Sequence, residues 1–147
     1  MGAPDDAVAR LRRHRLRVTP QRRAILESFR GTVDEHLSAE EVLSRASVAV
    51  PAIGRGTVYA ALNELTELGL LSSVGHAESI RYETNVRAHD HFHCRVCLRM
   101  FDVDLGGAEM PADRPAGYRV ESVAVRADGV CPVCRSAGRT LVAEAPG

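Results

Sequence analysis

Apolar residues recur at helical spacing near the start of the chain. In residues 5–15, Leu11 and its apolar neighbours fall on one side and arginines on the other, which predicts a short helix. Thr19 can cap a second helix through its hydroxyl, and Pro20 suits the first helical position because its missing N–H is not needed there. The apolar spacing then continues to Gly31, where we expect that helix to end.

Two further helices and a hairpin are predicted between residues 38 and 83. Ser38 and Glu41 form a capping-box pattern, in which each side chain accepts a hydrogen bond from the other residue's backbone N–H. A fourth helix is expected from about residue 57 to Leu68, with Gly69 at its end. Residues 70–83 indicate two short strands around a turn that contains glycine. Helices followed by such a hairpin predict a winged helix-turn-helix.

The pattern changes after the hairpin. Residues 92–105 and 118–131 are strand candidates, whereas residues 106–117 are rich in glycine and proline and predict a loop. We therefore expect an α+β fold with two domains, a winged helix-turn-helix over residues 1–85 and a small α/β domain over residues 86–147.

The four cysteines form two CxxC pairs. Cys94 and Cys97 make the first pair, and Cys131 and Cys134 make the second after 33 intervening residues. In a reducing compartment two such pairs are typical of a tetrahedral four-thiolate Zn²⁺ site that stabilises a small domain. A redox-active dithiol is the alternative.

The segment AHDHFHCRVC, residues 88–97, holds more potential ligands than one ion accepts. Side chains on a strand alternate between faces, so His89, His91 and His93 share one face and Cys94 lies on the other. The histidines and the cysteines are therefore expected to serve different ions. Neighbouring residues on one face lie about 6.6 Å apart, which allows His89 with His91, or His91 with His93, to chelate one metal.

Charge is unevenly distributed along the chain. The formal net charge is zero, but residues 1–30 hold eight arginines and three acidic residues. Every basic residue is an arginine, so phosphate contacts would use guanidinium groups or backbone N–H groups. This end of the chain is suited to an anionic partner.

Membrane association is not expected. No apolar run approaches the roughly 18 residues that span a bilayer, and the N-terminus lacks the apolar core of a signal peptide. These features predict a cytoplasmic protein.

Several motifs, taken in order, resemble the ferric uptake regulator (Fur) family of bacterial metal-dependent repressors. They are LRVTPQRRAILE at 16–27, HLSAEEVL at 36–43, GTVYAALNELTELGLL at 56–71, RYE at 81–83, HDHFHCRVC at 89–97 and CPVC at 131–134. The resemblance implies a homodimer. Its N-terminal winged helix would bind double-stranded operator DNA, and its C-terminal domain would dimerise and sense a divalent metal.

The sequence departs from the family pattern at three places. Leu98 stands where glycine usually follows the first CxxC pair, and Ala60 stands where arginine or asparagine commonly follows TVY. The loop at 106–117 replaces the usual helix of the dimerisation domain. A third metal site of some members would need histidines near Arg87 and Val123, so we predict that it is absent here.

The resemblance also implies a regulatory ligand set. The family's HxH pattern selects the first two histidines of the segment, which leaves His93 as a packed or outer residue. The ligands implied are His36, Glu83, His89, His91 and Asp102. This mixture of imidazole and carboxylate suits Fe²⁺ or Mn²⁺, with Ni²⁺ and Zn²⁺ as alternatives. Asp90 and Glu109 are candidates for remnants of the third site.

The DNA contacts are expected on the helix at about residues 55–68. This helix would enter the major groove, where Arg55, Thr57 and Tyr59 can reach base edges and thymine methyl groups.

Three further arginines are candidates for contacts outside the major groove. Arg17 matches a basic family residue that probes an A·T-rich minor groove. Arg22 or Arg23 is expected to contact phosphate.

The position of Asp102 resembles the peroxide-sensing branch of the family, so we expect repression to respond to peroxide as well as to metal. A plain iron-, nickel- or zinc-responsive repressor is the alternative. A non-haem iron enzyme is a more distant alternative, because no β-barrel pattern or substrate pocket accompanies the ligands. We therefore expect no small organic substrate. A zinc-ribbon adaptor without DNA binding is disfavoured by the arginine-rich winged helix.

Overall fold

The chain forms two compact units, Met1–Val86 and Arg87–Gly147. The computed structural model describes residues 7–31, 36–75, 80–107, 116–121 and 123–139. Most of the loop predicted at 106–117 lies outside these residues. Within them, no helix is both long and apolar enough to cross a membrane.

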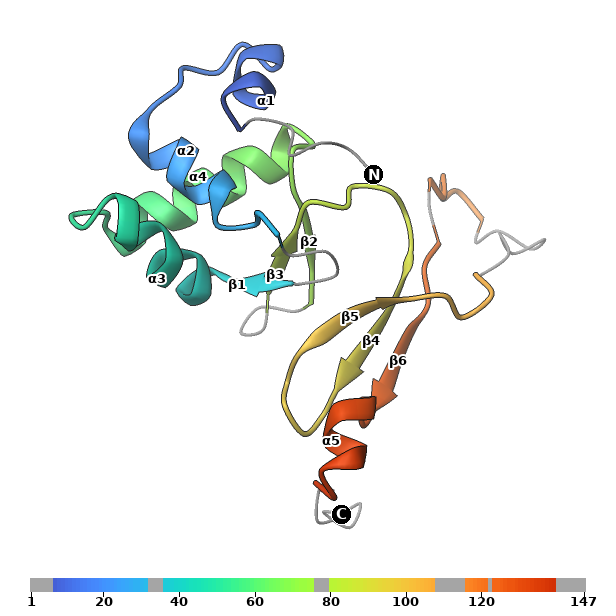
Figure 1. Cartoon of the computed structure of the whole chain (residues 1–147). Coiled ribbons are helices and arrows are strands. Elements are labelled where there is room, and N and C mark those ends of the chain that lie inside the picture. The colour runs from blue at the N-terminus through green and yellow to red at the C-terminus, as the bar shows by residue number, and fades with distance from the viewer. Residues whose placement is uncertain (1–6, 32–35, 76–79, 108–115, 122, 140–147) are drawn as a thin grey trace. The chain divides into compact units, whose positions relative to one another are not determined.

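Four helices build the first unit (Figure 1). They are α1 (Ala7–Arg13), α2 (Pro20–Glu27), α3 (Ala39–Ala49) and α4 (Arg55–Glu67). The second helix packs against the other three, and α3 also packs against α4. Their inward faces share a core that excludes water and supplies the main favourable term of folding. Its fully buried members include Leu11, Ile25, Val42, Val58, Leu62 and Leu65.

The helix boundaries follow the predicted caps. Thr19 Oγ accepts a hydrogen bond of 3.2 Å from the backbone N–H of Arg22, so α2 begins as expected. The capping box of Ser38 and Glu41 is complete at the start of α3. Gly69 follows α4 with a φ of +70°, in the left-handed region that glycine adopts without steric cost.

The second helix is shorter than predicted. It ends at Glu27 rather than at Gly31. Phe29 and Arg30 continue the chain in a tightened turn, in which each backbone N–H bonds the carbonyl three residues earlier. Apolar spacing alone does not distinguish such a turn from one more turn of α-helix.

A three-stranded antiparallel sheet completes the first unit. Its strands are β1 (Leu37–Ser38), β2 (Ser72–Val74) and β3 (Arg81–Glu83), in the order β1-β3-β2. The pairing of β2 with β3 confirms the predicted hairpin of the wing. The pairing of β1 with β3 was not predicted, because a two-residue strand is too short to show a period.

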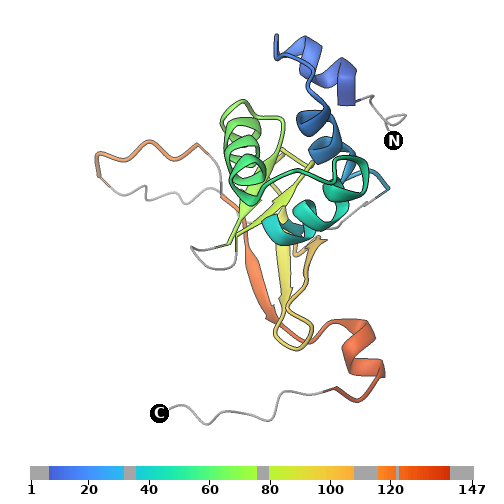
Figure 2. The ribbon, with the colours of Figure 1, turned by 90° about the vertical axis from the view of Figure 1, so that its left-hand side faces the viewer.

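The second unit contains another three-stranded sheet and one short helix. The strands are β4 (Asp90–Cys94), β5 (Met100–Val103) and β6 (Arg126–Gly129), with β4 in the middle. β4 pairs antiparallel with β5 and parallel with β6. Figure 2 shows β6 in orange beside β4 in yellow, with the helix α5 (Pro132–Ser136) after β6.

The strand prediction for residues 118–131 was therefore only partly right. Among its described residues only β6 forms, and residues 118–121 lie outside any strand.

A glycine lets two of these strands pack closely. Gly129 on β6 lies beside Phe92 on β4, and a Cβ atom added at Gly129 would lie 3.1 Å from Cζ of the Phe92 ring. That distance is shorter than an ordinary carbon contact of about 3.5–4.0 Å. A methyl group at Gly129 would therefore press against the Phe92 ring, which would have to give by a few tenths of an ångström.

We predict that Gly129→Ala lowers the free energy of unfolding of the second unit by about 1–3 kcal/mol, because the new methyl group overpacks against Phe92. Denaturant unfolding of zinc-loaded protein measures this change. Gly56→Ala in α4 is the matched control, since a Cβ atom there meets nothing within 4 Å. Equal unfolding midpoints for Gly129→Ala and the unmodified protein would contradict the packing argument.

Candidate metal centres

The four cysteines come together at one end of the second sheet. Cys94 ends β4, Cys97 lies in the turn that follows, Cys131 directly precedes α5 and Cys134 lies within it. All four thiols are free, and their sulfur atoms lie within 4.8 Å of one another. The Sγ atoms of Cys97 and Cys131 are 3.9 Å apart. A tetrahedron with Zn–S bonds of about 2.3 Å has edges of about 3.8 Å, so the geometry fits Zn²⁺.

Burial and hydrogen bonds set the thiol acidities. Burial opposes ionisation of Cys94, but N–H groups of Cys97, Cys131 and Val96 together outweigh it and lower the pKa of Cys94 from 9.0 to about 6. Burial and the neighbouring thiols raise the pKa of Cys134 to about 12. One thiolate is thus stabilised by the protein itself. Ionising all four requires a cation among them, and this again fits Zn²⁺.

The turn after Cys94 holds a strained residue. Leu98 adopts a φ of +59°, and its backbone N–H donates to the Cys94 carbonyl at 2.9 Å. A left-handed conformation costs a residue with a Cβ atom roughly 1–2 kcal/mol, which explains why glycine suits this position. The Leu98 side chain is also 59% exposed.

In the first unit, an imidazole and a carboxylate are buried against each other. His36 Nε2 lies 2.9 Å from Glu83 Oε2, and the two side chains are only 0% and 4% exposed. The strand register brings them together. Leu37 on β1 pairs with Tyr82 on β3, so the residue before β1 falls opposite Glu83. The contact lacks hydrogen-bond geometry among the described residues, and this suits two ligand atoms directed at a third centre.

The second unit places three ligand candidates together. His91 on β4 pairs with Asp102 on β5, and His89 Nε2 lies 3.0 Å from Asp102 Oδ1. The rings of His89 and His91 have centroids 4.3 Å apart. A ligand atom from each of the three residues lies within 4.8 Å of the others. Two imidazoles and a carboxylate in this arrangement can chelate one divalent ion.

His93 has a different partner. Its Nδ1 atom lies 2.9 Å from Asp128 Oδ1 on β6, and Arg126 bonds the same carboxylate. The hydrogen bond from His93 and those from Arg126 lower the pKa of Asp128. His93 thus packs against β6, and its lesser role in metal binding stays a prediction. Asp128 carries no motif that could have identified it from the sequence.

Asp90 anchors the backbone around the ligands. Its Oδ1 accepts a hydrogen bond from the N–H of Val125, and its Oδ2 accepts two from the N–H groups of Leu105 and Gly107, at 3.0–3.2 Å. The bond from Val125 is the largest influence that lowers the pKa of Asp90. This buried carboxylate is fully engaged with backbone, which gives it a structural role. Glu109, the other candidate remnant of a third site, lies outside the described residues.

The predicted DNA-contact residues of α4 lie at its exposed N-terminal end. Thr57 and Tyr59 are exposed, and Arg55 is 69% exposed while forming an ion pair of 3.1 Å with Glu40. Such an exposed pair stabilises the fold by at most about 1 kcal/mol, so it leaves Arg55 available to a stronger anion.

The arginines near α2 are held differently. Arg17 is exposed. Arg22 bonds both carboxylate oxygens of Glu64 on α4 and thereby joins the two helices. Arg23 forms an ion pair with Glu27 one turn along α2. Sequence reasoning missed Glu64 because it lies 42 residues from its partner.

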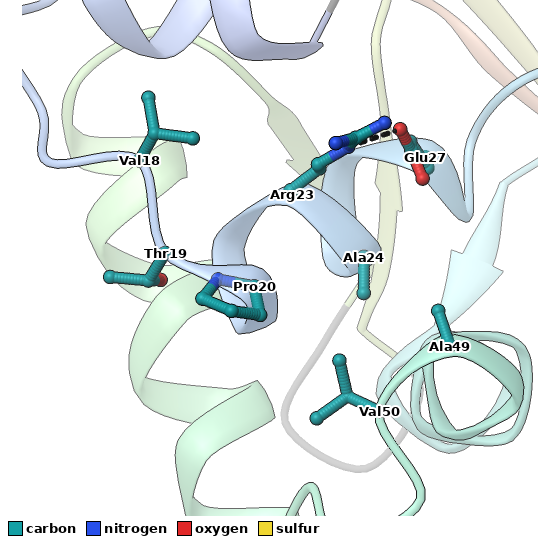
Figure 3. A pocket seen from close by; sticks show the side chains of 8 residues that line it. All are labelled: Val18, Thr19, Pro20, Arg23, Ala24, Glu27, Ala49 and Val50. Carbon is teal, nitrogen blue, oxygen red and sulfur yellow. Dashed lines mark hydrogen bonds and ion pairs between the residues drawn. The ribbon is translucent and has the colours of Figure 1, made fainter.

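A surface hollow of about 420 Å³ lies beside the start of α2 and the end of α3 (Figure 3). The ion pair of Arg23 and Glu27 borders it. The lining contains no histidine or cysteine, so the hollow is separate from both groups of metal-ligand candidates. The residues that line the hollow are Val18, Thr19, Pro20, Arg23, Ala24, Glu27, Ala49 and Val50.

Solved structures of two ferric uptake regulators have a similar fold. The Helicobacter pylori ferric uptake regulator, described as having three functional metal-binding sites, matches with a TM-score of 0.67 and 18% identity, over 91% of this chain and 95% of that one. The Francisella tularensis regulator with iron matches with a TM-score of 0.62 and 25% identity, over 82% and 95%.

Comparison of sequences identifies the family. The transcriptional regulator FurA of Mycobacterium tuberculosis is 33% identical over 139 residues, which cover 91% of this chain and 93% of the relative. The peroxide-responsive repressor PerR of Staphylococcus epidermidis is 27% identical over 138 residues, 91% of each. The ferric uptake regulator family itself matches residues 13–126. This chain therefore belongs to the ferric uptake regulator family.

Proposed function

We propose that this protein is a metal-dependent repressor that binds A·T-rich operator DNA as a homodimer. Family membership makes it a metal-responsive transcriptional regulator and not an enzyme. The proposal assigns DNA binding to the winged helix of residues 1–85. It assigns dimerisation, the structural zinc site and three of the five regulatory ligands to residues 86–147.

The proposed regulatory site joins ligands from both parts of the chain. His36 and Glu83 would come from the first, and His89, His91 and Asp102 from the second. One observation carries this proposal. Each unit by itself brings imidazole and carboxylate groups together, and these side chains have little exposure to solvent. Imidazole nitrogens and carboxylate oxygens are donors that a divalent first-row metal accepts, so each group could supply ligands to such an ion.

The proposed regulatory ion is Fe²⁺ or Mn²⁺, and the proposed structural ion is Zn²⁺. Nitrogen and oxygen donors accept several first-row metals, so Ni²⁺ and Zn²⁺ are alternatives at the regulatory site. Solved relatives carry different ions, iron in the Francisella tularensis regulator and manganese in that of Pseudomonas aeruginosa. In the cell, the availability of each metal would decide between them.

The proposed DNA surface consists of the exposed N-terminal end of α4 and the arginines around α2. Arg55, Thr57 and Tyr59 would read base edges in the major groove. Arg17 would enter an A·T-rich minor groove, and Arg22 and Arg23 would contact phosphate while keeping their ion pairs within the unit.

Our prediction for the structural site concerns Cys131→Ser. This protein should lose its one tightly held zinc ion and unfold its second unit, because three thiolates leave the tetrahedron incomplete. Elemental analysis and the oligomeric state in solution measure both effects. Ser136→Ala, in the same helix but outside the cluster, is the control and should keep its zinc. A folded, zinc-loaded dimer of Cys131→Ser would refute the assignment.

Our prediction for the regulatory site compares three histidines. His89→Ala and His91→Ala should abolish metal-dependent DNA binding with the fold and the zinc intact, because each removes a direct ligand. His93→Ala should cost no more than the roughly 10–100-fold that loss of an outer partner costs in metal affinity. Gel shifts with A·T-rich DNA at graded Mn²⁺ measure the difference. Equal losses for all three proteins would show that the chosen pair is wrong.

Our prediction for peroxide depends on Asp102, whose position resembles that of a carboxylate in the peroxide-sensing branch of the family. We expect low peroxide to release the Fe²⁺-loaded protein from DNA by transferring one oxygen to the imidazole of His36 or His91, with water as the other product. The modified peptide should gain about 16 Da, and the Mn²⁺-loaded protein should resist because Mn²⁺ does not undergo that redox step. Mass spectrometry of both forms measures the modification.

Unmodified histidines in Fe²⁺-loaded protein that stays on DNA would favour the plain iron repressor. Earlier oxidation of Cys94 and Cys97 would move the switch to the zinc site.

A further inference from the structure

Arg81 on β3 holds the backbone of a proposed metal ligand. Its Nη1 atom donates one hydrogen bond to the backbone carbonyl of His36 and another to Glu41 Oε2, both at 3.0 Å. The Arg81 side chain is only 18% exposed. A charged donor in a partly desolvated position makes stronger hydrogen bonds than a neutral surface group, so this contact is more than an incidental ion pair.

Glu41 connects this contact to the start of α3. The same Oε2 atom accepts a hydrogen bond of 2.8 Å from the backbone N–H of Ser38, and Ser38 Oγ accepts one of 3.2 Å from the N–H of Glu41. Partial burial opposes ionisation of Glu41, but the bonds to Ser38 and the charge of Arg81 outweigh it and lower its pKa. The capping box therefore fixes the backbone that follows His36 as well as the helix.

Two residues of β3 contact His36, one at its backbone and the other at its imidazole. Arg81 and Glu83 are two residues apart on β3, so their side chains share a face, while Tyr82 between them is buried in the core. Arg81 donates a hydrogen bond to the backbone carbonyl of His36, and Glu83 lies against the imidazole of His36. The pairing of β1 with β3 keeps these two contacts in register.

We propose that Arg81 and Glu41 are positioning residues for the metal ligand His36, and this inference rests on the regulatory site proposed above. They orient the backbone of His36 so that its imidazole and the Glu83 carboxylate approach one ion together. A ligand that must first be ordered binds metal more weakly, because part of the binding free energy is spent on fixing its conformation. The RYE motif thus supplies a ligand and the support for a second ligand.

A simpler role must be distinguished from this one. Loss of a helix cap alone lowers stability without any direct effect on a metal ligand. Glu41→Gln separates the two roles, since the Gln oxygen can still accept from Ser38 while the negative charge that binds Arg81 is gone. Thr19→Ala is the matched control for capping, because it removes the hydroxyl that caps α2.

The test measures Mn²⁺ affinity and stability on the zinc-loaded full chain. Dissociation constants come from the electron paramagnetic resonance signal of free Mn²⁺, and stability comes from denaturant unfolding. Arg81→Gln should weaken Mn²⁺ binding by about tenfold, the lower end of the range for lost outer partners, and Glu41→Gln should weaken it by a smaller factor. Arg81→Lys, which keeps the charge, should recover part of the loss. Thr19→Ala should bind Mn²⁺ like the unmodified protein despite its lower stability.

His36→Ala separates failure of this inference from failure of the proposed site. An unchanged Mn²⁺ affinity in His36→Ala would contradict the proposed regulatory site itself. Strong loss in His36→Ala, with both Arg81→Gln and Glu41→Gln matching Thr19→Ala, would overturn the positioning role alone. Should Arg81→Gln unfold, Glu41→Gln decides the question by the same comparison.

Discussion

The register of short antiparallel strands is the constraint on which the ligand geometry depends. Leu37 opposite Tyr82 places His36 against Glu83, and His91 opposite Asp102 brings an imidazole and a carboxylate together in the second unit. Because strand side chains alternate with a period of two, a slip of one residue would turn the candidate ligands on the slipped strand to the other face. The same alternation sends Cys94 away from His91, which separates the thiols from the imidazoles of the candidate regulatory site.

Several anchors protect this register. Asp90 binds three backbone N–H groups and ties β4 to the segments after β5 and before β6. Gly129 leaves room for the Phe92 ring of the neighbouring strand, and the bonds of Arg81 and Glu41 hold the backbone beside His36. Such contacts would hold the proposed ligands of a regulatory ion in place, which lowers the conformational cost of binding.

Local patterns predicted much of this fold. The caps at Thr19, Ser38 and Gly69 and the wing hairpin follow from side-chain chemistry within a few residues, and the CxxC spacing predicted the cysteine cluster. The five-residue helix α5 was missed because it is shorter than any window that shows a helical period. Alternation along β4 left two histidine pairs open, and only resemblance to the family selected one. Contacts across long stretches of chain, such as Arg22 with Glu64 or His93 with Asp128, leave no local signal.

In a metal-dependent repressor of the kind proposed, one regulatory ion and operator DNA favour the same state of the protein. Thermodynamic linkage then requires that each raise the affinity for the other by the same factor. The direct measurement is the Mn²⁺ dissociation constant of zinc-loaded protein with and without a saturating A·T-rich DNA duplex. We predict that DNA tightens Mn²⁺ binding by the factor by which Mn²⁺ tightens DNA binding, about 5–150-fold for typical coupling energies. A Mn²⁺ dissociation constant that is the same with and without DNA would contradict it.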